Sequence, residues 1–320
     1  MRIVLQLVTI FMVFLNLSFK NSKKILMINS YHKGYVWSDK LEEGVKSVLG
    51  SNADIALEIK YMDSKRNKSG DFISSKAAEL KNYIEQSKPD LLIASDDNAS
   101  KYLIKPYYKN HKIPVVFCGV NWTAKNYEYP YKNVTGMVEV SPIKLAFKYF
   151  NEFSGKKIED AKFGHLEEDT ISGRKNAENI ERYLGIKLQK EYAKNYEEWK
   201  EKFRKLNDTA DFITMGGNAE VENWDKDAAV KFVEEHTKAI TATDLDWMIL
   251  YSLFGFVKVP EEQGEWAAKT AIEILNGKAP SKIPIAFNQQ GNLMLNMKIA
   301  KKLKIKIPYQ LVTKAKVIIK

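Results

Sequence analysis

Residues 25–49 constrain the fold of this 320-residue chain more than any other stretch. They open on the apolar run 25–28, which is short and flanked by polar residues, as expected for a buried strand. A polar loop follows, and Leu41 and Val45 then recur at helical spacing, with Ser38 as the expected N-cap. A strand, a loop and a helix in this order form the first unit of an α/β domain.

The same layout recurs through both halves of the chain, although no residue-level repeat is visible. Short apolar runs that alternate with amphipathic segments predict parallel sheets with right-handed crossovers. We therefore expect two α/β lobes, which the predicted segments from residue 283 onward connect to each other. The predicted strands are residues 25–28, 55–61, 91–94, 115–118, 133–139, 161–164, 187–192, 211–215, 247–251, 283–287, 293–295 and 312–319, and the predicted helices are 38–49, 72–86, 99–108, 141–153, 174–184, 196–206, 225–240, 265–275 and 297–303.

The charge balance and the cysteine count argue against several classes of protein. The chain has 50 Lys and Arg against 40 Asp and Glu, but the basic residues are scattered, so we interpret the excess as a solvated surface. Cys118 is the one cysteine, which rules out a disulfide within the chain, and we expect it to be buried at a strand end. The four histidines lack metal-ligand spacing. We expect no metal, no cofactor and no nucleic-acid partner.

Residues 1–20 differ in composition from the rest of the chain. Arg2 precedes an apolar span over residues 3–19, and a polar run follows at residues 20–24. A basic start, an apolar middle and a polar exit are typical of a secretory signal peptide. The span is also close to the length that crosses a bilayer, so a retained N-terminal anchor stays open. In both cases we expect an exported protein, periplasmic or extracytoplasmic.

Candidate ligand-binding residues lie in the loops after the predicted strands, because open α/β sheets bind ligands at the carboxyl ends of their strands. The opening loop carries three large aromatics and a histidine, which suit a flat or apolar ligand. Carboxylates can hold an ammonium group, and aromatic faces add a cation–π attraction of about 0.5–2 kcal/mol. The candidates are Ser30, Tyr31, His32, Tyr35, Trp37, Asp96, Asp97 and Asn121 in the first half, and Thr170, Ser172, Asn218 and Phe254 in the second.

Several of these residues also fit a structural interpretation. Some of the aromatics can simply cover the sheet edge, and His32 can be a stacked spacer. Asp96 and Asp97 can cap the next helix, and Ser172 is an N-cap candidate. Glu139 lies where the chain is expected to cross between lobes, so a hinge or rim position competes with ligand contact.

We do not expect an enzyme. The sequence has no glycine-rich phosphate loop, no serine nucleophile elbow and no metal-binding cluster. Adjacent acidic pairs, such as Glu167 with Glu168, are expected by chance in a chain with 40 acidic residues. A glycosidase needs two carboxylates that face each other across a cleft, and a sequence alone does not reveal such a pair.

Five stretches carry a resemblance to a known family. They are NSYHKGYVWSDKLEEGVKSVL at 29–49, FCGVN at 117–121, NVTGMVE at 133–139, PEEQGEWAAKTAIEILNGKAPSKIPI at 260–285 and NMKIAKKLKIKIP at 296–308. In this order they resemble the bacterial solute-binding proteins of the ABC-transporter substrate-binding family, which includes tryptophan and tyrosine binders. The resemblance extends over residues 24–317.

The resemblance implies a type I periplasmic-binding fold, with two doubly wound parallel-sheet lobes joined by a three-stranded hinge. Lobe 1 would comprise residues 24–138 and 261–288, and lobe 2 residues 139–260 and 289–320. We expect a monomer that captures a small organic ligand and delivers it to the membrane permease of an ABC importer. The best candidate for the ligand is an amino acid, and an aromatic one is among the options. The alternative is a sensory ligand-binding module that signals to a membrane-bound kinase or chemoreceptor.

Overall fold

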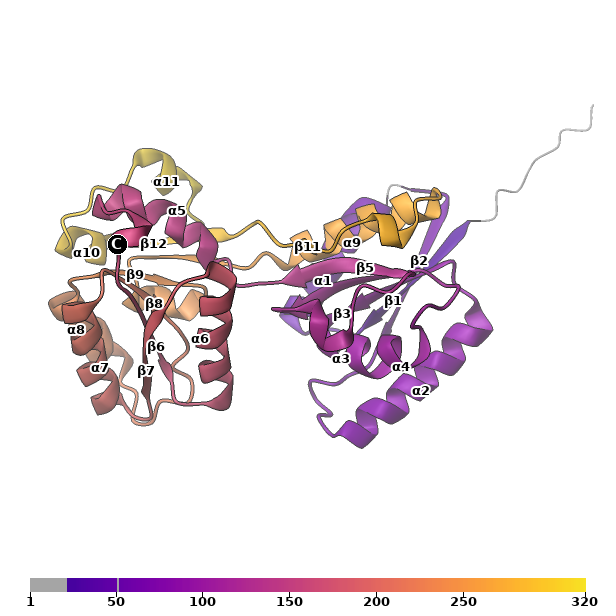
Figure 1. The fold of residues 1–320 in the computed structure, drawn as a ribbon, viewed down its shortest axis with the longest axis horizontal. Helices are drawn as coiled ribbons and strands as arrows, with labels where there is room; N and C mark the ends of the chain where they lie inside the picture. Colours follow the sequence, from indigo (N-terminus) through magenta and orange to yellow (C-terminus); the bar gives the residue numbers. More distant parts are fainter. Residues whose placement is uncertain (1–21, 51) are drawn as a thin grey trace, which may run out of the picture.

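The computed structural model describes residues 22–50 and 52–320, which form two α/β lobes side by side (Figure 1). Three segments of chain run between the lobes, so the predicted architecture is confirmed. The segment predicted as a signal peptide or anchor, residues 1–20, lies outside the described residues. Within the described ranges, no helix is long and apolar enough to cross a membrane.

The first lobe is built on a sheet in which all neighbouring strands are parallel. Its central strands are buried on both faces because helices cover each side, which explains their continuous apolar runs. In spatial order the strands are β11 (Ala286–Phe287), β5 (Val134–Glu139), β4 (Val115–Asn121), β3 (Leu91–Ser95), β1 (Lys23–Asn29) and β2 (Ile55–Tyr61). The helices are α1 (Val36–Leu49) and α9 (Pro260–Leu275) on one face, and α2 (Gly70–Ser87), α3 (Asp96–Ala99), a π-helical turn (Ser100–Ile104) and α4 (Lys105–Tyr107) on the other.

The second lobe contains a longer sheet, which is parallel except where β10 and β12 pair antiparallel. Aromatic side chains, among them Phe147, Phe163 and Phe212, fill much of its core. In spatial order the strands are β13 (Val317–Ile319), β12 (Asn292–Asn296), β10 (Phe254–Val257), β9 (Ile240–Thr243), β8 (Phe212–Met215), β6 (Phe163–Glu168) and β7 (Leu188–Ala193). The helices are α5 (Ile143–Ser154), α6 (Ile171–Leu184), α7 (Tyr196–Thr209), α8 (Lys226–His236), α10 (Met297–Lys302) and α11 (Tyr309–Lys314).

The three crossings between the lobes follow β5, β10 and β11, and hydrogen bonds tie them to one another. The Asn288 side chain donates to the Val140 carbonyl at 3.1 Å and accepts from the Val140 N–H at 2.7 Å. The Glu262 carboxylate accepts from the backbone N–H groups of Gln289 and Gln290 at 2.8 and 2.9 Å. The third crossing is therefore bonded to both of the others, and the three act as one hinge.

Two strand predictions near the C-terminal half are wrong. Residues 247–251 form a 3₁₀ helix (Asp246–Tyr251), the neighbouring strands are β9 and β10, and the helix predicted to reach Ile240 ends at His236. The predicted strand 312–319 divides into the end of α11 and β13. A short apolar run fits a buried strand and a buried helical turn equally well. Here Met248 and Ile249 are buried, but they belong to a helical turn and not to a strand.

The start of α1 also differs from the prediction. The N-cap position is Tyr35, and its side chain makes no capping hydrogen bond. Ser38 lies inside the first turn, where its buried hydroxyl donates to Oδ1 of Asn29 at 3.0 Å. The predicted cap is therefore wrong, because this hydroxyl joins α1 to the end of β1.

Two glycines let α1 and α9 pack with their backbones in contact. A Cβ atom on Gly44 would lie 2.2 Å from the Glu261 carbonyl oxygen, and one on Gly264 would lie 2.0 Å from the Leu41 carbonyl oxygen. α9 is the first element after the second crossing. This close approach therefore holds the returning chain against the first lobe.

We predict that Gly264→Ala destabilises the protein, because the added methyl group forces α1 and α9 apart. Overpacking of this kind costs about 1–3 kcal/mol, and each kcal/mol lowers the Tm of a chain of this size by roughly 2–4 °C. Gly70→Ala is the matched control, since its Cβ would have only the Tyr102 hydroxyl nearby, at 3.8 Å. Thermal unfolding followed by circular dichroism compares the two, and equal Tm values would contradict the packing argument.

Candidate functional site

Three carboxylates meet at the carboxyl edge of the first sheet. Asp96 and Asp97 directly follow β3, and Glu139 is the last residue of β5. β3, β4 and β5 are parallel neighbours, so their carboxyl ends lie at the same edge. Asp96 is 2% exposed and Glu139 is 6% exposed. The edge therefore holds a buried acidic group where α/β proteins bind ligands.

Asp96 has an incomplete set of partners. Its Oδ1 accepts a hydrogen bond from the Trp37 indole N–H at 3.1 Å. Its Oδ2 is buried and has no partner with hydrogen-bond geometry within the described residues. Burial raises the pKa of Asp96 well above its ordinary value, and the charge of Glu139 raises it further. The free oxygen leaves Asp96 able to accept from a ligand.

Asp97 is held in place by donors from the last residue of β4 and from the 3₁₀ turn that follows it (Ala124–Tyr127). Its Oδ2 accepts from the Asn121 side-chain amide at 2.7 Å, and its Oδ1 accepts from the Tyr127 hydroxyl at 2.6 Å. Burial and the Asp97 charge raise the pKa of Tyr127, so the hydroxyl keeps its proton and donates. Neither Asp96 nor Asp97 caps the helix that follows, because no side-chain capping bond forms at its start.

Glu139 connects the acidic group to the hinge. Its Oε1 lies 2.6 Å from Nζ of Lys258, which follows β10 on the second crossing. Burial raises the pKa of Glu139, while the Lys258 ammonium acts in the opposite direction. The charge of Asp244 also acts on both groups. A single ion pair thus joins two of the three crossings at the edge of the site.

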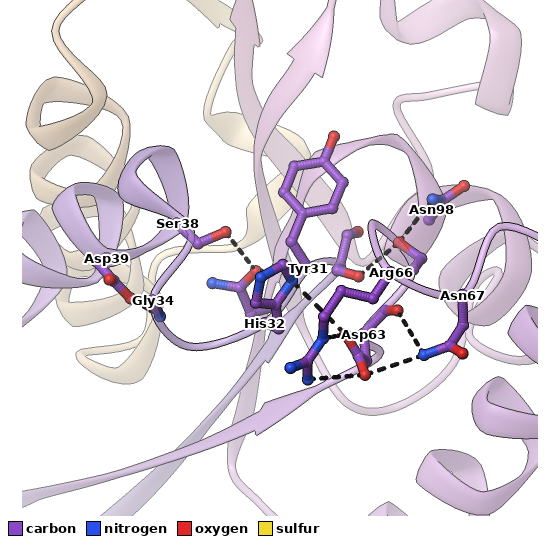
Figure 2. A network of polar contacts seen from close by, with 12 residues as sticks. Tyr31, His32, Gly34, Ser38, Asp39, Asp63, Arg66, Asn67 and Asn98 are labelled. Atoms are coloured by element: carbon purple, nitrogen blue, oxygen red, sulfur yellow. Dashed lines mark hydrogen bonds and ion pairs between the residues drawn. The ribbon is translucent and has the colours of Figure 1, made fainter.

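Tyr31 and His32 of the opening loop point in different directions (Figure 2), although the His32 ring also lies 5.9 Å from the Tyr35 ring between centroids. His32 lies 3.6 Å from Asp63, which also binds Arg66 at 2.7 Å, so His32 belongs to a polar network on the side of the loop. Figure 2 shows the Tyr31 ring pointing away from this network. The ring meets Tyr35 edge to face at 5.1 Å between centroids.

Tyr31 lies close to the acidic group. Burial raises its pKa, and the charges of Asp96 and Asp97 raise it further. Lys65 lies over both rings of the loop, 4.8 Å from the Tyr31 centroid and 5.3 Å from that of Tyr35. These contacts place a partly exposed aromatic surface next to the carboxylates.

Ser30 has its hydrogen-bonding capacity used inside the fold. Its hydroxyl donates to the Ser95 carbonyl at 2.6 Å and accepts from the Ala99 N–H at 2.8 Å. It is fully buried. In this structure Ser30 joins β1 to α3, and it presents no free group to a ligand.

The candidates of the second lobe are spread over several elements. Thr170 is the N-cap of α6, with its hydroxyl accepting from the Gly173 N–H at 2.9 Å, and Ser172 is exposed inside the first turn. The cap is therefore Thr170, not Ser172. Asn218 follows β8 and accepts from the Trp247 indole N–H at 3.1 Å, beside a hollow of about 430 Å³. Phe254 is 1% exposed and packs in the core, which removes its ring from the accessible surface.

Sequence reasoning missed several residues at this edge. Tyr127 and Lys258 reach the carboxylates from segments far away in the chain. Gln263, in the first turn of α9, accepts from the Gly119 N–H at 2.9 Å, and its own amide nitrogen is buried without a partner in the described structure. The signal was a position just after a predicted strand, and Tyr127, Lys258 and Gln263 all lie further along the chain than the predicted strand ends.

The described part of the chain contains no cluster of His, Cys, Asp and Glu that could hold a metal ion. Cys118 is fully buried, as expected, but it lies inside β4 and not at its end, and burial raises the pKa of its thiol. The thiol is therefore neutral and shielded, and we assign it a packing role.

Comparison with known families identifies the class of protein. Residues 36–319 match the family of ABC transporter substrate binding proteins, and the chain belongs to this family. A search of curated protein sequences finds no match.

Three solved structures are similar to this chain in fold. The ligand-free, open structure of CD0873, a substrate binding protein with adhesive properties from Clostridium difficile, is 16% identical with a TM-score of 0.68, covering 93% of this chain and 99% of that one. A domain from Streptococcus pneumonia in complex with L-Trp is 16% identical with a TM-score of 0.52, covering 93% and 100%. A periplasmic ribose ABC transporter protein from Conexibacter woesei is 12% identical with a TM-score of 0.54, covering 91% and 98%. The predicted type I periplasmic-binding fold is thereby confirmed.

We predict that Asp96 makes the protein less stable as the pH rises. A carboxyl group with a raised pKa holds its proton longer in the folded state than in the unfolded chain, where its pKa is about 3.9. The free energy of unfolding therefore falls as the pH rises from about 4 through the raised value. Asp96→Asn removes this dependence, so the variant gains stability relative to wild type between acidic and neutral pH.

Urea unfolding of both proteins across this pH range measures the effect. Asp160→Asn is the control, since Asp160 is exposed and lies before β6, at the opposite end of the strands. Parallel stability curves for wild type and Asp96→Asn would contradict the buried, proton-binding carboxyl.

Proposed function

We propose that this protein captures an amino acid between its two lobes outside the cytoplasm and delivers it to the membrane permease of an ABC importer. Membership of the substrate-binding family supports a small-molecule ligand and a permease partner. The hinge of three bonded crossings supports capture by closure, since hinge motion about ligands is a common mode of domain closure. We expect the protein to act as a monomer.

The observation that carries this proposal is the excess of carboxylate at the edge of the first sheet. Of Asp96, Asp97 and Glu139, only Glu139 has an ion-pair partner in the described structure, which is Lys258. Burying charge without a counter-ion is costly, and a ligand cation reduces that cost. The free Oδ2 of Asp96 supplies an acceptor for an ammonium group.

The aromatic surface beside these carboxylates supports a ligand with a flat or apolar side chain. Tyr31, Tyr35 and Trp37 lie next to the acidic group, and a cation over such a face gains about 0.5–2 kcal/mol. An amino acid with an aromatic side chain uses both features. We propose that Thr170, Ser172 and Asn218 of the second lobe contact the ligand after closure.

The sensory alternative gains no support from the family match or from the fold. A sugar is the competing ligand class, because one similar structure is described as a ribose transporter protein. Sugars lack an ammonium group, so the acidic edge favours the amino acid.

We predict that free amino acids with aromatic side chains raise the Tm, whereas their N-acetyl derivatives do not. At about 100 times its Kd a ligand adds roughly 2.7 kcal/mol to the free energy of unfolding, which is a shift of several degrees. A thermal-shift screen of the chain from Asn21 onward measures this. Equal shifts with the N-acetyl compounds, or shifts with sugars alone, would contradict the proposal.

The matched variant pair is Asp96→Asn and Asp160→Asn, which remove the same charge inside and outside the site. Removing one partner of a buried charge pair costs about 2–5 kcal/mol, so Asp96→Asn should weaken binding at least about 30-fold. Asp160→Asn should leave the Kd unchanged.

We also predict that ligand binding releases protons at mildly acidic pH. Burial raises the pKa values of Asp96 and Glu139, and a bound ammonium group favours their ionised forms and lowers these values again. Affinity therefore rises with pH until the carboxyl groups are ionised in the free protein. Titration calorimetry at about pH 5–6, in two buffers of different ionisation enthalpy, counts the protons. Binding of an uncharged ligand, without release of protons, would argue against an ammonium group at this edge.

A further inference from the structure

The amino edge of the first sheet carries a set of lysines, just as its carboxyl edge carries acids. β1 begins at Lys23, and single lysines precede the other central strands: Lys88 before β3, Lys112 before β4 and Lys132 before β5. The strands are parallel, so the segments before them gather at one edge. This edge lies on the side of the first lobe that faces away from the second lobe (Figure 1).

Two adjoining hollows bring these lysines together. The first, of about 480 Å³, is lined by Lys81, Lys88 and Lys112. The second, of about 540 Å³, is lined by Lys112, Lys132 and Lys278. His111 and Lys112 line both, so they form the wall between the hollows. We call the exposed trio Lys88, Lys112 and Lys132 the basic edge.

The basic edge carries charge that the protein itself does not neutralise. The carboxylates nearby are already paired: Asp90 with Lys23 at 3.2 Å and Glu85 with Lys81 at 2.7 Å. Lys278 pairs with Glu273 at 2.7 Å. In the described ranges, none of the three lysines of the basic edge has an ion-pair partner. Three ammonium groups thus surround two hollows that are open to an external anion.

The surroundings of the basic edge favour a lipid surface over a dissolved anion. Tyr107 is 41% exposed and lies in the first hollow beside the apolar side chains of Ile84, Pro89 and Ile113. A tyrosine with an apolar body and a polar tip is typical of a membrane–water interface. β1 starts at this edge, and the stretch interpreted above as a signal peptide or anchor precedes β1 in the sequence.

We propose that the basic edge rests on an anionic phospholipid surface, with phosphate headgroups in the two hollows and Tyr107 at the interface. The acidic edge of the same sheet, which is the candidate ligand site, then faces away from the membrane, so delivery to a permease requires the protein to leave this orientation. The headgroup attraction acts over about a Debye length, roughly 10 Å at 0.1 M salt, and weakens as salt rises.

Vesicle co-sedimentation tests this proposal with the chain from Asn21 onward, which contains both sheets and all three crossings. Vesicles of phosphatidylglycerol mixed with phosphatidylcholine should bind the protein at about 0.1 M salt and release it at about 0.5 M. Vesicles of phosphatidylcholine alone should not bind it. Each lysine near an anionic surface strengthens binding about fivefold, so replacing three should weaken it about a hundredfold.

The variant for this test is the triple substitution Lys88→Gln, Lys112→Gln and Lys132→Gln. The charge-matched control is Lys231→Gln, Lys306→Gln and Lys314→Gln, which are exposed lysines of the second lobe with no ion-pair partner in the described structure. Only the first variant should lose vesicle binding, and both should keep the wild-type Tm.

Three outcomes would overturn the proposal. Equal vesicle binding by the two triple variants would mean that total charge, and not this edge, attracts the lipid. Absence of wild-type binding to anionic vesicles would remove the lipid partner. Binding of inorganic phosphate in calorimetry, together with no binding of the protein to anionic vesicles at the same ionic strength, would show a site for a dissolved anion instead of a surface contact.

Discussion

The parallel hydrogen-bond ladder that joins β2, β1, β3, β4, β5 and β11 is the interaction on which the rest of the first lobe depends. Strands that run in one direction bring all their carboxyl ends to one edge and all their amino ends to the other. Asp96, Asp97 and Glu139 meet at the first edge, and Lys88 and Lys112 meet at the second. The ladder therefore separates opposite charges by the length of a strand.

The hinge is built from the same edge as the candidate site. Glu139 ends β5, belongs to the acidic group and holds Lys258 of the second crossing. Val140, its chain neighbour, is bonded to Asn288 of the third crossing. A charge bound at this edge thus acts on a carboxylate that is itself part of the connection between the lobes. We propose that a ligand charge bound at this edge acts on Glu139, which would couple ligand binding to lobe movement.

Hydrophobic pattern predicted most of the fold because it reports burial directly. Residues 55–61 were predicted as a strand, and β2 has the same bounds. The prediction worked because apolar and polar residues alternate along this edge strand. The pattern failed at residues 247–251, where burial is real but the backbone is helical. Burial alone does not specify backbone conformation over five residues, and the neighbouring strands that decide it come from other parts of the chain.

Only part of the candidate site could be predicted, because the sequence gives the position of a residue but not the contacts of its side chain. Trp37, Asp96, Asp97 and Asn121 could be named from their positions after strands, but the bonds between Trp37 and Asp96 and between Asn121 and Asp97 could not. Their role in ligand binding stays a prediction. Ser30 follows the same positional rule, yet its side chain points into the fold. Phe254 fails because the strand predicted at 247–251 is a 3₁₀ helix, so Phe254 opens β10 and does not follow a strand. Direction of a side chain depends on packing, which a position in sequence does not contain.

The sequence by itself determined the alternation of strands and helices, the two-lobe class and the residue types available at each strand end. Only the tertiary structure decided which of these residues meet. The lysines appeared scattered in the sequence, and the parallel sheet gathers three of them around two hollows. Tyr127 and Lys258 likewise join the acidic group from distant segments. The physical reason is that periodicity encodes which face of an element is buried, whereas charge clusters arise from strand order and direction, which are set by long-range pairing.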